Sequence, residues 1–93
     1  MNHMSSTQAA RRTPVFSARV VLSGGRLLEA MIEGGRAYRL RWGLPGAWRV
    51  AYAPGERVVD GRRRPYAFRS VEQLRYDFEC DVEHAQAADR DGR

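Results

Sequence analysis

The chain contains no lysine, only one cysteine and no long apolar run. A single thiol, Cys80, excludes an intramolecular disulfide and is more typical of a reducing cytoplasm than of a secreted protein. The N-terminal segment shows no signal-peptide pattern, and no stretch approaches the roughly 20 apolar residues of a membrane-spanning helix. We therefore expect a cytoplasmic protein with no membrane role.

All 16 positively charged side chains are arginines, and the formal net charge is +5. Residues 1–71 carry a net charge of +9 and residues 72–93 a net charge of −4. Planar guanidinium groups bind phosphate bidentately, so arginine usage favours a polyanionic ligand. A GC-rich bacterial genome, whose codons favour arginine, alanine and glycine, is the simpler explanation. Composition alone does not decide between the two.

A chain of 93 residues has room for one domain with a thin core. Residues 1–13 and 86–93 are polar and lack apolar periodicity, so we predict disordered tails at both ends. The single domain is then expected over residues 14–85. Two Gly-Gly pairs and the segment Leu44–Gly46 divide the first part of this domain into strand-like runs.

Four of these runs alternate apolar and polar side chains, as half-buried strands do. They begin near Phe16, Leu27, Ala37 and Ala47. The alternation predicts that four large aromatic side chains point inward: Tyr38, Trp42, Trp48 and Tyr52.

Turn chemistry sets the expected strand register. A three-residue loop at Ser23–Gly25 pairs Val20 with Leu28 and puts a glycine where a left-handed residue is needed. An equivalent loop at Glu33–Gly35 would place Ala30 opposite Tyr38. A loop centred on Pro45 would then place Trp42 opposite Trp48 and Leu40 opposite Val50.

The last third of the chain changes to helical periodicity. Residues 56–60 suit a short fifth strand, and Arg62–Pro65 is predicted as an exposed connection. Tyr66 and Phe68 are expected to return to the core. Ser70 and Gln73 form a capping box before an apolar stripe at helical spacing, which ends at Ala85. The predicted fold is α+β: an antiparallel four- to five-stranded β-meander with one C-terminal α-helix packed on its inner face.

No catalytic constellation is visible, so we expect a protein that is not an enzyme and needs no cofactor. His3 lies in a predicted tail, and His84 suits a capping role at the helix end. Cys80 is more typical of a half-buried small side chain than of a nucleophile. Asp77, Asp81 and His84 share a helix face, but such groupings are common by chance, so no metal site is predicted.

The outer face of the predicted sheet contains the main candidate binding residues. Glu29 is expected between Arg19 and Arg39, as in ordinary cross-strand ion pairing. Arg41 and Arg49 would face each other without a carboxylate between them, which favours a visiting anion. The predicted nucleic-acid-binding residues are Arg39, Arg41, Arg49, Arg62, Arg63 and Arg64.

Two functions of different classes fit these features. One is a small nucleic-acid-binding or regulatory accessory factor that contacts phosphate through the arginine-rich sheet face. The alternative is a protein-interaction module, such as an inhibitor, adaptor or small subunit, without a nucleic-acid role. Val21, Leu27 and Met31 would form an outer apolar patch that suits a protein partner or a homodimer.

Overall fold

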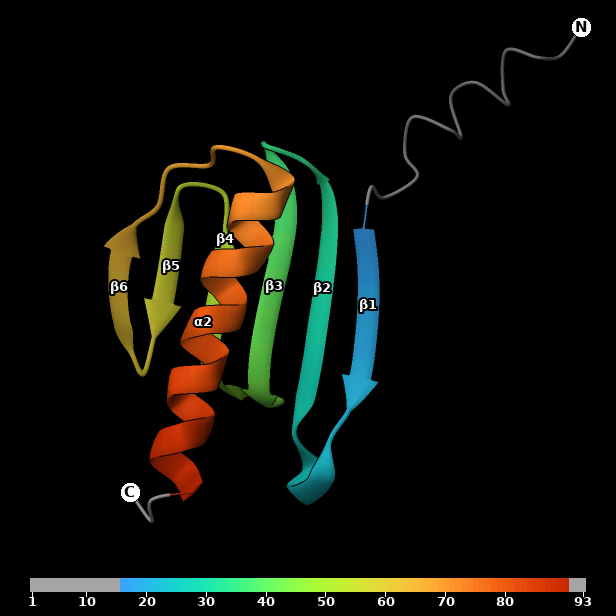
Figure 1. Cartoon of the computed structure of the whole chain (residues 1–93), viewed down its shortest axis with the longest axis vertical. Coiled ribbons are helices and arrows are strands. Elements are labelled where there is room, and N and C mark those ends of the chain that lie inside the picture. Colours follow the sequence, from blue (N-terminus) through green and yellow to red (C-terminus); the bar gives the residue numbers. More distant parts are fainter. Residues whose placement is uncertain (1–15, 91–93) are drawn as a thin grey trace, which may run out of the picture.

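The computed structural model describes residues 16–90 as one six-stranded antiparallel sheet and one helix (Figure 1). The elements are β1 (Phe16–Val21), the 3-10 turn η1 (Ser23–Gly25), β2 (Leu27–Gly34), β3 (Ala37–Leu44), β4 (Ala47–Ala53), β5 (Glu56–Val59), β6 (Arg62–Pro65) and α2 (Val71–Arg90). The strands lie side by side in chain order. The α+β meander is confirmed, with six strands rather than four to five. The predicted tail at residues 1–13 lies outside the described residues.

The core lies between the central strands and α2, which crosses in front of the middle of the sheet in Figure 1. Alternation places one side of each strand in this core. Its largest fully buried side chains are Trp42, Tyr52, Ile32, Leu40, Leu74 and Val50. The helix contributes Leu74, Phe78, Val82 and Ala85, spaced at three or four residues so that they share one face.

Helix α2 begins as predicted but ends later. The Ser70 hydroxyl oxygen accepts a hydrogen bond from the Gln73 backbone N–H at 3.0 Å, which satisfies one of the free donors of the first turn. The helix continues to Arg90 and so includes residues 86–90, the first part of the predicted C-terminal tail. His84 is therefore exposed in the body of the helix rather than at its end. Within residues 16–90 no helix is long and apolar enough to cross a membrane.

The first hairpin has the predicted register, with Val20 paired with Leu28. Gly25 has the expected left-handed conformation at φ 81°. The second hairpin differs, because Tyr38 pairs with Ile32 and not with Ala30. A bulge near the end of β2 shortens the turn to two residues and moves the register by two. Such a shift leaves every side chain on its predicted face.

The third hairpin contains a bulge that changes which side chains face outward. Trp42 pairs with Val50, and Gly43 pairs with Trp48, so Arg49 is the extra residue on β4. The predicted pairing of Trp42 with Trp48 is wrong. Trp48 lies under the guanidinium of Arg41 on the outer face, and Arg49 reaches α2 instead. An added Cβ at Gly43 would lie 2.7 Å from the Arg49 backbone nitrogen, so the bulge requires glycine there.

The segment Arg62–Pro65 is exposed, as predicted, but it forms strand β6 and not a connection. β6 pairs with β5 along its whole length, and Arg64 lies opposite Arg57. Asp60 and Gly61 form the turn between them with φ values of 51° and 82°. Two successive left-handed residues are the signature of a tight hairpin turn that favours Asp-Gly. After β6, Tyr66 and Phe68 pack against the core as predicted.

The core should depend strongly on Leu74, whose side chain is fully buried at 0 % exposure. We expect Leu74→Ala to lower the free energy of unfolding by about 2–5 kcal/mol, a large share of the stability of so small a domain. Urea unfolding followed by circular dichroism measures this. Val21→Ala, at 72 % exposure, is the control and should change the free energy by less than about 0.5 kcal/mol. Equal midpoints for the two variants would contradict the packing described.

Candidate functional site

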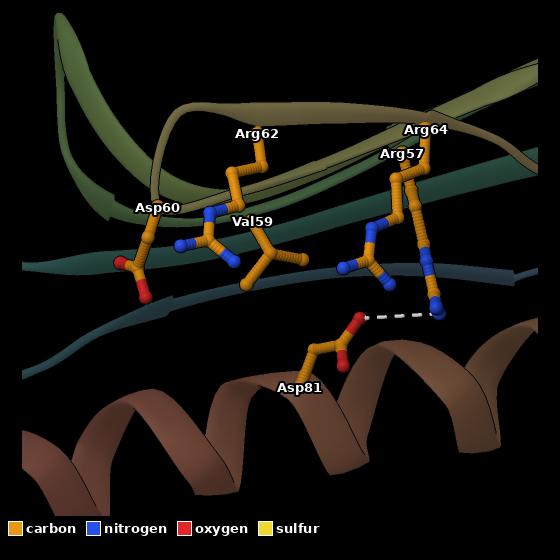
Figure 2. Close-up of a pocket in the computed structure, with 6 residues that line it drawn as sticks. All are labelled: Arg57, Val59, Asp60, Arg62, Arg64 and Asp81. Atoms are coloured by element: carbon orange, nitrogen blue, oxygen red, sulfur yellow. Dashed lines mark hydrogen bonds and ion pairs between the residues drawn. The ribbon is translucent and has the colours of Figure 1, made fainter.

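A groove of about 400 Å³ lies between the β5–β6 hairpin and α2 (Figure 2). Six residues line it: Arg57, Val59, Asp60, Arg62, Arg64 and Asp81. Five of them carry a charge, and Figure 2 shows that the arginines of β6 point down from the sheet while Asp81 rises from the helix. We call this feature the arginine groove.

The strand register explains why these residues meet. Val59 pairs with core residue Val50 and with Arg62, whereas Arg57 pairs with core residue Tyr52 and with Arg64. Paired residues point to the same face of a sheet. The arginine groove is therefore the continuation of the core face beyond the edge of the helix, where charged side chains replace apolar ones.

Arg57 is held in place by a buried tyrosine and a helix carboxylate. The Tyr52 hydroxyl donates a hydrogen bond to Asp81 Oδ2 at 2.6 Å and accepts one from Arg57 Nη1 at 3.0 Å. Arg57 Nη1 also lies 3.5 Å from Asp81 Oδ2. Burial, and then the bond to Asp81, raises the pKa of Tyr52, so the hydroxyl keeps its proton. Arg57 and Asp81 thus largely offset each other's charge.

Arg62 and Arg64 have no such partner. Within residues 16–90 no carboxylate lies within ion-pair distance of either guanidinium. The other acid of the groove, Asp60, pairs with Arg49. Each carboxylate of the arginine groove therefore has its own arginine, and Arg62 and Arg64 supply two uncompensated positive charges.

Arg63 points to the opposite face of β6, because it lies between Arg62 and Arg64 on the strand. Its Nη1 contacts Glu56 Oε1 at 2.6 Å, and both side chains are well exposed, at 68 % and 39 %. The predicted arginine run is consequently divided, with two residues in the groove and one on the outer face.

The outer face is more nearly neutral than predicted. Glu29 lies between Arg19, at 3.1 Å, and Arg41, at 2.8 Å, whereas Arg39 was expected in the place of Arg41. The two-residue register shift of β3 causes this exchange, and Arg39 pairs with Met31 instead. These bonds, to Arg41 first and then to Arg19, lower the pKa of Glu29.

The predicted like-charge pair of Arg41 and Arg49 does not exist. Arg41 pairs with Ala51 across the strands, and its guanidinium lies 4.4 Å from the centre of the Trp48 ring. Arg49 lies on the helix side, where it contacts Asp60 and, at 2.8 Å, Asp89. Three of the six predicted binding residues thus face the helix side, namely Arg49, Arg62 and Arg64, and three face outward, namely Arg39, Arg41 and Arg63.

Four of the six residues that line the groove were absent from the predicted site, namely Arg57, Val59, Asp60 and Asp81. Arg57 had a usable signal in the sequence, because Asp60-Gly61 between two short runs indicates a tight hairpin. That hairpin places Arg57 opposite Arg64. Asp81 had no comparable signal, since the sequence does not show which side of the helix meets the last two strands.

Two guanidinium groups without a carboxylate partner among the described residues can bind an anion. Neither histidine nor cysteine lines the arginine groove. In the part of the chain that the structure describes, no group of three acidic, histidine or cysteine residues is placed to hold a metal ion. No family model, curated protein or solved structure matches the chain.

The lowered pKa of Glu29 predicts a pH-dependent contribution to stability. Because the folded pKa lies below the ordinary 4.5, the ion pairs stabilise the fold above about pH 4.5. This stabilisation is lost as the pH falls through the folded value, when the carboxylate takes up a proton. Glu29→Gln should therefore be less stable than the parent protein near neutral pH, and the difference should shrink in acid.

Urea unfolding from about pH 7 down to about pH 3 measures this difference. Glu33→Gln removes the same charge from the same strand, where the described residues give it no ion-pair partner. The free energy of unfolding of Glu33→Gln should stay close to that of the parent protein at every pH. A pH-independent difference for Glu29→Gln would show that the two arginines do not stabilise the carboxylate.

Proposed function

We propose that the protein is a small nucleic-acid-binding accessory factor that holds the phosphate backbone in the arginine groove. The observation that carries this proposal is the pair of uncompensated guanidinium groups, Arg62 and Arg64, side by side on one face of β6. Uncompensated arginines in a concave site favour phosphate, which accepts two parallel N–H bonds from each guanidinium. We propose a binding role without catalysis and a cytoplasmic location, which the lone thiol favours.

The spacing supports contact with a polymer. Two residues apart on one strand face, Arg62 and Arg64 lie roughly 6.5–7 Å from each other along the strand. Two such groups can neutralise neighbouring phosphates of a single strand, and every neutralised phosphate adds affinity. No aromatic side chain lines the groove, so base stacking does not contribute. Binding is expected to depend on the backbone and to be nearly independent of base sequence.

Fluorescence anisotropy with mixed-sequence single-stranded oligonucleotides tests the proposal at about 50 and about 200 mM salt. The parent protein should bind and weaken steeply as salt rises. The Arg62→Gln, Arg64→Gln double variant should lose most of the binding. The slope of log affinity against log salt should fall by about 1.4, or about 0.7 for each lost phosphate contact.

The matched control is the Arg39→Gln, Arg63→Gln double variant, which removes two positive charges from the outer face. If the proposal is right, this double variant keeps the parent protein's slope of log affinity against log salt and most of its affinity for the oligonucleotide. Equal losses in both double variants would mean that total charge, and not the groove, attracts the nucleic acid. No binding at about 50 mM salt would refute the proposed function.

A second candidate is a protein-interaction role. Val21 is 72 % exposed and pairs with Leu27 at the end of β1. Met31 is also exposed, but Glu29 and its two arginines separate it from this pair, so the apolar patch is smaller than predicted. Sedimentation velocity over a range of protein concentrations tests the homodimer form. Association that Val21→Asp abolishes supports it, and a monomer at every concentration rules it out.

A further inference from the structure

The arginine groove offers a hydrogen-bond acceptor as well as donors. Asp81 Oδ2 accepts the Tyr52 hydroxyl and lies near Arg57, but in residues 16–90 no hydrogen bond reaches Asp81 Oδ1. The side chain is 20 % exposed and lines the groove. One carboxylate oxygen therefore has no partner among these residues, on a side chain that lines the arginine groove.

A carboxylate is an unfavourable neighbour for phosphate alone, because like charges repel. The hydrogen bond from the Tyr52 hydroxyl gives Asp81 one structural role, but this bond uses only Oδ2. A ligand that carries a hydroxyl next to its phosphate would use both kinds of group. The phosphates would contact Arg62 and Arg64, and the hydroxyl would donate to Asp81 Oδ1.

Ribose phosphate has this combination, and the 2′-hydroxyl is the group by which proteins distinguish RNA from DNA. We infer that the arginine groove binds single-stranded RNA in preference to DNA, with Asp81 accepting the hydrogen bond of a 2′-hydroxyl. The inference rests on the proposed function and names its ligand class. It requires no contact with the bases.

The size of the groove agrees with one sugar-phosphate unit. Its volume of about 400 Å³ lies within the range of small-ligand sites, roughly 300–1,000 Å³. A volume of this size is too small to enclose a duplex. Because β6 is an edge strand of the sheet, we expect a single strand to run along it with one ribose near Asp81.

The test compares three single-stranded oligonucleotides of one base sequence, which carry a 2′-hydroxyl, a 2′-hydrogen or a 2′-fluorine. Fluorine cannot donate a hydrogen bond but keeps a sugar pucker close to that of RNA. We expect the 2′-hydroxyl strand to bind about tenfold more tightly than either other strand, the effect of one hydrogen bond to a charged group. Anisotropy at about 50 mM salt measures all three.

The other outcomes separate this inference from the proposed function. If the 2′-fluoro strand binds as tightly as RNA, or if DNA does, the hydroxyl is not recognised and the inference is wrong, while phosphate binding stands. If none of the three strands binds, the proposed function fails and the inference fails with it.

A pair of matched variants tests the role of Asp81. Asp81→Asn and Asp77→Asn each remove one negative charge from α2, and each carboxylate accepts a tyrosine hydroxyl at 2.6 Å, from Tyr52 and Tyr66 respectively. Because an ionised acceptor makes a bond roughly twice as strong as a neutral one, Asp81→Asn should lower the RNA-to-DNA affinity ratio severalfold. Asp77→Asn should leave this ratio unchanged. The ratio is taken within each variant, so a loss of folded protein does not alter it. An unchanged ratio in Asp81→Asn would overturn the assignment.

Discussion

The structure depends on one geometric mismatch: a single helix is narrower than the sheet that it covers. Six strands about 4.8 Å apart span roughly 24 Å from first to last, whereas a helix with its side chains is about 10–12 Å across. Only the central strands can be buried under α2. The helix does not cover the two flanks of the inner face. The side chains that occupy the flanks differ between the β1 side and the β5–β6 side.

On the β1 side the flank stays apolar and a helix side chain extends over it. Phe16 and Leu28 are partly buried, and the Arg75 guanidinium lies 3.9 Å from the centre of the Phe16 ring. On the β5–β6 side the inner face becomes charged instead, and water or a ligand can occupy the space. The arginine groove is thus a consequence of sheet width, since every further strand beyond β4 carries the core face farther from the helix.

The acidic helix and the basic sheet also interact within the domain. Several carboxylates of the helix contact the rest of the domain. Asp89 pairs with Arg26 and Arg49, and Asp81 and Asp77 accept hydroxyl groups of the sheet side. Such contacts are half-buried and are screened less than exposed pairs. Six of the 13 arginines in residues 16–90 form ion pairs within the domain, so the number of arginines alone overstates the surface available to an anion.

Alternation and turn chemistry were sufficient for the meander, for the inner face apart from Trp48 and Arg49, and for the start of the helix, because each of these depends on local patterns. They were insufficient for register, since a shift of two residues keeps every side chain on its face and leaves the alternation unchanged. The bulge opposite Gly43 had a larger effect, because it exchanged the faces of Trp48 and Arg49. That exchange removed the predicted outer arginine pair. The site itself depends on which carboxylates reach which arginines, a tertiary property that distinguishes Arg62 from Arg63 although they are adjacent and chemically identical.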